Sequence, residues 1–173
     1  MPIVLNGSGT VTGISAGGLP DGCITAAELA SGVGGKVLQA VSNTSTTTVN
    51  TSGATKSDLL TVTITPASTS NKVLVMAQLT TYTYPTNNAY AGAYIFRGAN
   101  SDASPAGTTI AQSVTGYSTT NHLYDNYSLK VLDSPNTSSA QVYTLSMARQ
   151  SHNTNYITTD GYLYHLIAME IAA

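Results

Sequence analysis

Hydrophobic and polar residues alternate with a period of two along most of the chain beyond residue 35. Such alternation is typical of β-strands, because successive side chains point to opposite faces of a sheet. Clusters of Gly, Pro, Asn and Ser interrupt the alternation and indicate turns. The pattern predicts strands at Lys36–Ser42, Asp58–Thr65, Lys72–Tyr82, Ala89–Arg97, Thr108–Thr115, Tyr124–Leu132, Ser138–Arg149 and Gly161–Ile171. No helix is predicted among them, so we expect an all-β fold over residues 36–173, an antiparallel β-sandwich of the jelly-roll type with about eight strands.

The predicted strands differ in how many of their faces are apolar. In Leu60–Thr65, apolar residues alternate with threonines, as in a strand with one face toward a core and one toward water. Both faces are mostly apolar in Val73–Leu79, Tyr90–Phe96 and Tyr162–Ile171. Since no predicted helix covers the second face, we expect another copy of the chain to do so.

This reasoning predicts a homo-oligomer. A homotrimer is favoured, although a dimer would cover the same face equally well. The residues expected at the subunit interface are Tyr90, Tyr94, Tyr162 and Tyr164. The alternative is that these tyrosines fill the core of the sandwich, with their hydroxyl groups at its edges.

Residues 1–35 form a leader that is rich in glycine and has no lysine or arginine. Two short β-like pieces, Pro2–Leu5 and Thr10–Ile14, precede the capping-box sequence Thr25–Glu28, which predicts a short helix. A helix of this length is not stable alone in water. We therefore expect the leader to bury its apolar side chains against another surface. The side chains expected to do so are Ile3, Leu5, Val11, Ile14, Leu19 and Leu29.

Charged residues make up only 8% of the chain, against about 25% in typical soluble proteins, and the formal net charge is −2. Six lysines and arginines neutralise few phosphates, so nucleic acid is not expected as a partner. No apolar run approaches the roughly 18 residues of a membrane span, and no secretory signal is recognisable. We expect synthesis in a cytoplasm and no membrane partner. The single cysteine, Cys23, excludes an intrachain disulfide.

The sequence does not predict an enzyme or a cofactor site. Gly7–Gly13 has one residue too many for a nucleotide-binding turn, and β-branched residues lie where the helix should begin. The three histidines do not have the spacing of zinc ligands, although His122 and Asp125 leave a weak loop ion site as an alternative. There is no nucleophile motif, and the only two glutamates, Glu28 and Glu170, lie near opposite ends of the chain. We expect no catalytic residues, no metal and no cofactor.

Three loops combine aromatic rings with neutral amide and hydroxyl groups. Sugars stack their C–H faces on such rings, and their hydroxyl groups bind uncharged donors and acceptors. We therefore expect these loops to face a receptor on the host surface that carries a glycan; the alternative is that they are simply polar loops. The candidate receptor-facing residues are Tyr82, Tyr84, Asn87, Asn88, Tyr117, Asn121, His122, His152, Asn153 and Tyr156.

The start of the chain reads MPIVLNGSGTVTGISAGGLPDG over residues 1–22 and ITAAELA over residues 24–30. It resembles the leader of small tail-fiber and related virion proteins of tailed bacteriophages, particularly phages of cyanobacteria and other marine bacteria. The sequence LIAMEIAA at residues 166–173 resembles the close of the same proteins. The middle of the chain resembles their trimeric jelly-roll heads only in its Ser-, Thr- and Asn-rich style.

The resemblance implies a virion protein with an attachment segment at residues 1–35, which binds other tail or baseplate proteins, and a displayed head at residues 36–173. The function it implies is that of a tail fiber or fiber tip for host attachment. A second interpretation is a capsid decoration protein, and a third is a glycan-degrading enzyme of the tail.

Overall fold

The computed structural model describes residues 4–5, 11–12, 36–52, 55–83, 90–99, 102, 106–116, 123–149 and 157–173. The chain divides into two compact units, Met1–Lys36 and Val37–Ala173. In the first unit, β1 (Val4–Leu5) pairs antiparallel with β2 (Val11–Thr12). Both strands lie within the two β-like pieces that the sequence predicts. The expected leader helix, together with Ile3, Ile14, Leu19 and Leu29, lies outside the described residues.

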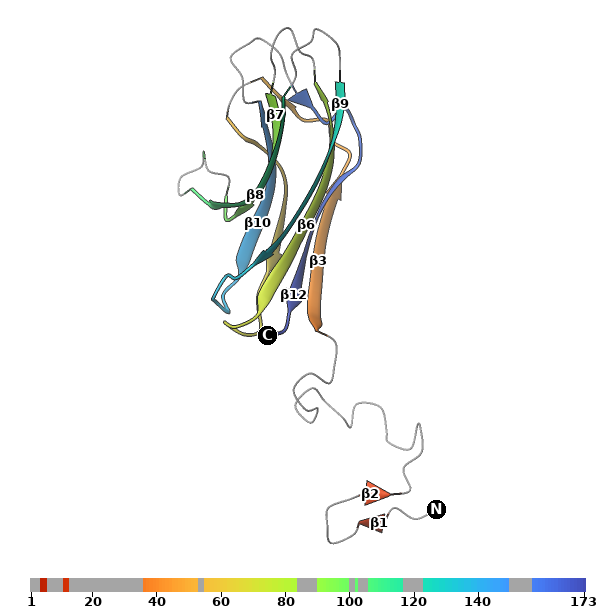
Figure 1. Cartoon of the computed structure of the whole chain (residues 1–173), viewed down its shortest axis with the longest axis vertical. Helices are drawn as coiled ribbons and strands as arrows, with labels where there is room; N and C mark the ends of the chain where they lie inside the picture. The colour runs from red at the N-terminus through yellow and green to blue at the C-terminus, as the bar shows by residue number, and fades with distance from the viewer. Residues whose placement is uncertain are drawn as a thin grey trace. The chain divides into compact units, whose positions relative to one another are not determined.

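The second unit, which we call the head, is a sandwich of two antiparallel sheets (Figure 1). The first sheet has the order β3–β12–β6–β9, and the second sheet has the order β5–β10–β7–β8. The strands of the first sheet are β3 (Val37–Ser45), β12 (Tyr164–Ile171), β6 (Lys72–Thr83) and β9 (Leu123–Asp133). Two short strands, β4 (Asn50–Thr51) and β11 (Ile157–Thr158), extend it beside the end of β6. The strands of the second sheet are β5 (Ser57–Ile64), β10 (Gln141–Arg149), β7 (Tyr90–Arg97) and β8 (Thr108–Gly116).

The connections between the long strands are those of a jelly roll. Following β3, β5, β6, β7, β8, β9, β10 and β12 along the chain, every step crosses from one sheet to the other except the β7–β8 step. This alternation places sequence-distant strands side by side in both sheets. The predicted all-β jelly-roll sandwich is thus confirmed, and each predicted strand coincides with one long strand to within a few residues. Only the two-residue strands β4 and β11 were not predicted.

The apolar core lies between the two sheets and follows the period-two pattern. On β6, every second residue from Val73 to Leu79 is buried, and the residues between them are half-buried or exposed. On β12, Leu166 and Ala168 are fully buried beside them. The second sheet contributes Ile95 of β7 and Leu145 of β10. Burial of these side chains supplies the main driving force for closing the sandwich.

Two polar clusters close the end of the head at which β3 begins, which we call the proximal end. In one, Asp133 of β9 accepts hydrogen bonds from Arg97 Nη1 at 3.2 Å and from the Tyr143 hydroxyl at 2.8 Å. Arg97 and Tyr143 belong to the second sheet, so the cluster joins the two sheets. Burial and the neighbouring Asp133 carboxylate raise the pKa of Tyr143 above its ordinary value.

The other proximal cluster surrounds Glu170, a fully buried carboxylate on β12. It accepts hydrogen bonds from Gln39 Nε2, Asn71 Nδ2 and the Ala67 backbone N–H, each at 2.6 Å. Burial alone raises the pKa of Glu170, but the three hydrogen bonds outweigh it, and the net pKa lies below its ordinary value. The Asn71 side chain also accepts a bond from the Ala173 backbone N–H. Glu170 therefore ties the β5–β6 turn to β3 and β12.

Candidate binding surface

The three loops expected to face a receptor begin and end at one end of the head, which we call the distal end. Thr83 at the end of β6 lies opposite both Leu123, where β9 begins, and Ile157, where β11 begins. Tyr90 lies opposite Gly116 in the second sheet. The strand register therefore brings the ends of the three loops together. Nine of the ten predicted loop residues lie outside the described residues: Tyr84, Asn87, Asn88, Tyr117, Asn121, His122, His152, Asn153 and Tyr156.

The leader joins the head at the opposite end from these loops. Val37, the first residue of β3, pairs with Ile171 of β12, which in turn pairs with Lys72 at the start of β6. From Lys72, β6 runs twelve residues to Thr83 at the distal end. At about 3.3 Å per residue, the two ends of β6 are about 36 Å apart. Within the head, Figure 1 shows β3 beginning at the end opposite the distal ends of β7 and β9.

Three tyrosine rings meet on the outward face of the first sheet near the distal end, and we call them the tyrosine cluster. Tyr82 of β6 lies directly opposite Tyr124 of β9, with ring centroids 4.7 Å apart and planes at 38°. Tyr162, in the turn before β12, meets Tyr124 edge to face, with centroids 5.9 Å apart and planes at 90°. Tyr124 is 52% exposed and Tyr162 is 44% exposed. Of these three, the sequence predicted Tyr82 as receptor-facing and Tyr162 at the subunit interface; Tyr124 closes one of the candidate loops but was not named among the receptor-facing residues.

Polar side chains fill the next two outward rows of the first sheet. Thr80 and Asn126 form the first row, and the Thr80 hydroxyl donates a hydrogen bond to Asn126 Oδ1 at 2.6 Å. Gln78 forms the second row, paired with Ser128 on one side and His165 on the other. These side chains carry hydroxyl, amide and imidazole groups. The tyrosine cluster thus borders a polar part of the sheet.

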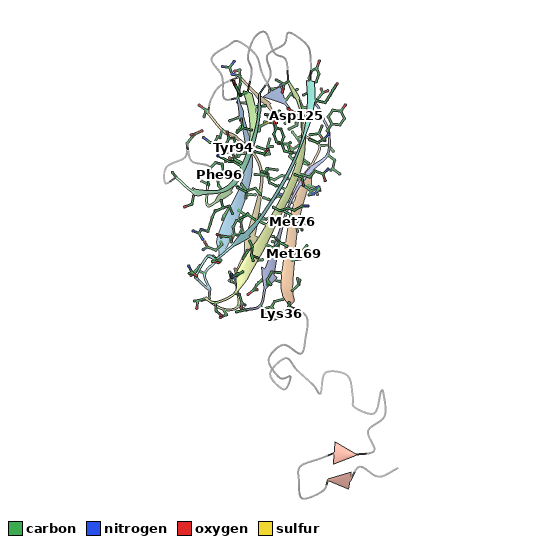
Figure 2. All side chains as sticks on the ribbon, in the orientation of Figure 1. Lys36, Met76, Tyr94, Phe96, Asp125 and Met169 are labelled. Atoms are coloured by element: carbon green, nitrogen blue, oxygen red, sulfur yellow. The ribbon has the colours of Figure 1, made fainter. Side chains whose placement is uncertain are left out.

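Apolar side chains occupy the outward rows nearer the proximal end, and we call them the apolar band. Leu132 is 51% exposed, and the other members are half-buried. The members are Leu74, Met76, Leu132, Ile167 and Met169. Figure 2 shows Met76 and Met169 on the β6 and β12 side of the head. Partly exposed apolar side chains that gather on one sheet face, here beside Lys130 of β9, are suited to a protein–protein contact.

The interior of the distal end is polar. Thr81 and Thr83 of β6 are buried, and among the described residues their hydroxyl groups have no hydrogen-bond partner. The Tyr127 hydroxyl donates to the Ala91 carbonyl at 3.1 Å and contacts Asp125 Oδ2 at 3.4 Å. Burial raises the pKa of Asp125, and the contact with Tyr127 offsets part of that rise. In the described part of the chain, no group of three His, Cys, Asp or Glu side chains has the arrangement of a metal site.

The structure corrects the interface prediction for Tyr164. Its side chain faces the core between the sheets, is 1% exposed, and donates a hydrogen bond to the Thr47 carbonyl at 3.0 Å. For this residue, the alternative that the tyrosines fill the core is the right one. Tyr90 and Tyr162 are 48% and 44% exposed, so their assignment to a subunit interface stays a prediction.

The prediction is also wrong for Tyr94, because its own chain covers it. Tyr94 and Phe96 lie on the outward face of the second sheet, their rings stacked at 6.1 Å, and they form a small buried cluster with Ala148 (Figure 2). The Lys56 ammonium group lies 5.4 Å from the centre of the Tyr94 ring and pairs with Asp102 of the β7–β8 connection. This apolar face therefore needs no second copy to shield Tyr94.

No family model and no curated protein matches the chain. Similar solved structures include those of infectious bursal disease virus. The Gx strain gives a TM-score of 0.41 at 10% identity over 78% of this chain and 37% of that chain. The Gt strain gives 0.39 at 12% identity over 79% and 39%. The VP2 subviral particle gives 0.36 at 11% identity over 78% and 38%. This chain thus spans less than two fifths of their length, and the jelly-roll assignment rests on its own strand order.

Proposed function

We propose that the chain is a non-enzymatic structural protein of a tailed-phage virion, in which the leader docks to the particle and the head is displayed for host attachment. The observation that carries this proposal is the position of the head's two ends. The leader joins the head at Val37, at the proximal end. The strand ends that flank the three aromatic and amide-rich loops lie at the distal end, about 36 Å away along β6. The resemblance of residues 1–30 to phage virion leaders is the reason for proposing a phage particle as the structure to which the leader docks.

The head associates with other copies of itself through the apolar band, and a trimer is favoured. The Leu74, Met76 and Ile167 side chains lie half-buried on an outward sheet face. Covering them with the same surface of a sister chain removes apolar area from water, and Lys130 of β9, the charged residue opposite Met76, borders the band. This contact replaces the one that was expected at Tyr94 and Tyr164.

The fiber-tip role is favoured over capsid decoration by the distance between the docking end and the loop end of the head. Bracing neighbouring shell subunits, the role of a decoration protein, does not require loops held far from the dock, whereas receptor binding at a fiber tip does. Partners in the virion are therefore tail or baseplate proteins that bind residues 1–35. In the described part of the chain, there is no helix long and apolar enough to cross a membrane.

Deletion of residues 2–33 tests the proposal in phage particles. The truncated protein should fold with the unfolding midpoint of the intact head, yet be absent from purified particles by mass spectrometry. Full-length protein labelled at an exposed loop should be seen on the tail by electron microscopy. Incorporation of the truncated protein would overturn the docking role, and a label on the capsid shell would assign the protein to decoration.

A further inference from the structure

We infer that the tyrosine cluster, Tyr82, Tyr124 and Tyr162, is a platform that binds a neutral saccharide. This inference rests on the proposed attachment function and names the site and the ligand class. The three residues come from β6, β9 and the turn before β12, so only the folded sheet brings them together. All three tyrosines lie in the part of the chain that the structure describes.

The ring geometry provides stacking surfaces for sugar rings. Tyr124 and Tyr162 are each about half exposed, and their planes stand at 90°. Tyr82 packs against Tyr124, with their ring centroids 4.7 Å apart. Two exposed rings held in fixed orientations lose little conformational entropy when a ligand stacks on them. The apolar C–H face of a pyranose is the sugar surface that such rings accept.

The side chains next to the rings supply hydrogen-bonding groups without a strong charge. Thr80 and Asn126 lie one outward row from Tyr82 and Tyr124, and Gln78 and Ser128 lie in the row after that. Outward rows are about 7 Å apart along a strand, so both polar rows are within the length of a short oligosaccharide stacked on the rings. Hydroxyl and amide groups both donate to and accept from sugar hydroxyls.

The charges near the cluster favour a neutral ligand over an anionic one. Asp160 is exposed in the turn two residues before Tyr162, and its carboxylate repels acidic sugars. On β9, the outward residue that could offset it is Lys130, which lies three rows from Tyr124 and pairs with Met76 of the apolar band. At about 7 Å a row, that ammonium group is too distant and too solvated to recruit an acidic ligand to the rings.

The position of the cluster also separates it from the proposed subunit contact. The polar rows of Thr80 and Gln78 lie between the tyrosine rings and the apolar band. A single protein–protein contact over both surfaces would have to bury these polar rows as well, at a cost in desolvation. We therefore place the tyrosine cluster outside the proposed contact through the apolar band, with Tyr162 in the ligand surface in place of the subunit interface predicted for it.

The test is binding of defined hexasaccharides to the purified full chain by saturation-transfer NMR and calorimetry. The probes are maltohexaose, cellohexaose, xylohexaose and chitohexaose, with a hyaluronan hexasaccharide as the acidic comparison. At least one neutral probe should bind, and the hyaluronan probe should not. Tyr124→Ala should weaken binding about tenfold or more, since one stacking partner is lost. Tyr124→Phe should bind within about twofold of the original protein, because the ring is kept.

Tyr90→Ala is the matched control, because Tyr90 is equally exposed at 48% but lies on the second sheet. It should bind as the original protein does. Failure of all four neutral probes, or full binding by Tyr124→Ala, would overturn the inference. A change of oligomeric state in Tyr124→Ala without any sugar binding would overturn it in favour of a subunit contact. The Tyr124→Ala variant keeps the leader. Its incorporation into phage particles therefore tests the proposed docking function independently of the sugar-binding result.

Discussion

The Tyr143 hydroxyl of β10 donates a hydrogen bond to the Asp133 carboxylate of β9 across the interior of the head, at 2.8 Å. Arg97 of β7 pairs with the same carboxylate, so both partners of Asp133 come from the opposite sheet. Asp133 is 9% exposed, and a carboxylate at that depth requires such partners. The proximal end of the sandwich is thus fastened by polar bonds where the apolar core ends.

Tyr143→Phe should lower the free energy of unfolding by about 1–2 kcal/mol at pH 7, because a buried acceptor loses one of its donors. Urea unfolding checks this value. Tyr90→Phe, which changes an exposed tyrosine hydroxyl, should have an effect below about 0.5 kcal/mol. Equal stability of the Tyr143→Phe and original proteins would show that Arg97 alone satisfies Asp133.

The same variant should alter unfolding in alkali. The pKa of Tyr143 is raised in the folded head, so the unfolded chain loses its phenolic proton first as pH rises. The contribution of Tyr143 is full below the ordinary tyrosine pKa of 10.0 and is lost as pH rises above it. Tyr127 contributes in the same direction. Tyr143→Phe should therefore show a shallower loss of stability above pH 10, measured by thermal unfolding across a pH series.

Glu170→Gln should destabilise the head by about 2–3 kcal/mol, since hydrogen bonds to a carboxylate are stronger than those to an amide. Whichever way the new amide is turned, its NH₂ group would face a donor, because Gln39, Asn71 and the Ala67 N–H all donate to this site. Gln39 cannot simply reverse, since its Nε2 also donates to the Thr65 carbonyl. Calorimetric unfolding at pH 7 measures the loss.

Lowering the pH should remove the contribution of Glu170 to the stability of the original protein. The pKa of Glu170 is lowered in the folded head, so the unfolded chain takes up the proton first as pH falls. The stabilisation is full above the ordinary value of 4.5 and is lost as pH falls through the lowered folded pKa. In this pH range, the free energy of unfolding of the Glu170→Gln variant should depend less on pH than that of the original protein. Asp160→Asn, at an exposed carboxyl, should cost less than about 0.5 kcal/mol at pH 7, and a larger loss would indicate a general sensitivity to carboxyl removal.

Gly92→Ala should destabilise the head by about 1–3 kcal/mol, because the new methyl group would meet the Tyr94 ring. An ideal Cβ at Gly92 would lie 2.6 Å from the Tyr94 hydroxyl oxygen and 2.9 Å from two ring carbons. The ring cannot move freely, since it stacks on Phe96 and lies beneath Lys56. In a Tyr94→Ala background, the same substitution should cost much less. Equal costs in both backgrounds, measured by urea unfolding, would contradict this packing.

Met76→Glu should dissociate the proposed oligomer and leave the head folded, because Met76 belongs to the apolar band and Lys130 lies opposite to pair with the new carboxylate. Sedimentation equilibrium at micromolar concentration measures the mass. Gln78→Glu, one outward row away on the same strand, should keep the oligomer. A monomeric original protein, or an unchanged mass in Met76→Glu, would exclude the apolar band as the subunit contact.

The long strands could be predicted from the sequence because alternation is a local property. Leu60–Ile64 shows it in full: apolar residues at every second position are buried, and the threonines between them are exposed. Alternation does not say which of two apolar faces is turned inward, or what covers the other. Tyr94 and Tyr164 were therefore given the same role, although one lies beneath its own chain's Lys56 and the other lies in the core.

The candidate site could be predicted only in part, because its residues come together through strand register. Tyr82 was identified from its neighbours in the sequence. Its partners Tyr124 and Tyr162 required two facts that a single sequence does not contain: that β9 pairs with β6, and that the turn before β12 returns to the same face. The role of Glu170 was hidden in the same way, since its partners Gln39 and Asn71 are 131 and 99 residues away along the chain.

The place of β12 in the first sheet has a consequence for biosynthesis. Residues 164–171 form an interior strand, hydrogen-bonded to β3 on one side and to β6 on the other. Until the ribosome has released these residues, β3 has no partner in its sheet and both strands expose their backbone edges. Closure of the first sheet must therefore wait until residues 164–171 have left the ribosome, and a chain that stops before residue 164 leaves unpaired edges that invite aggregation and degradation instead of a smaller working protein.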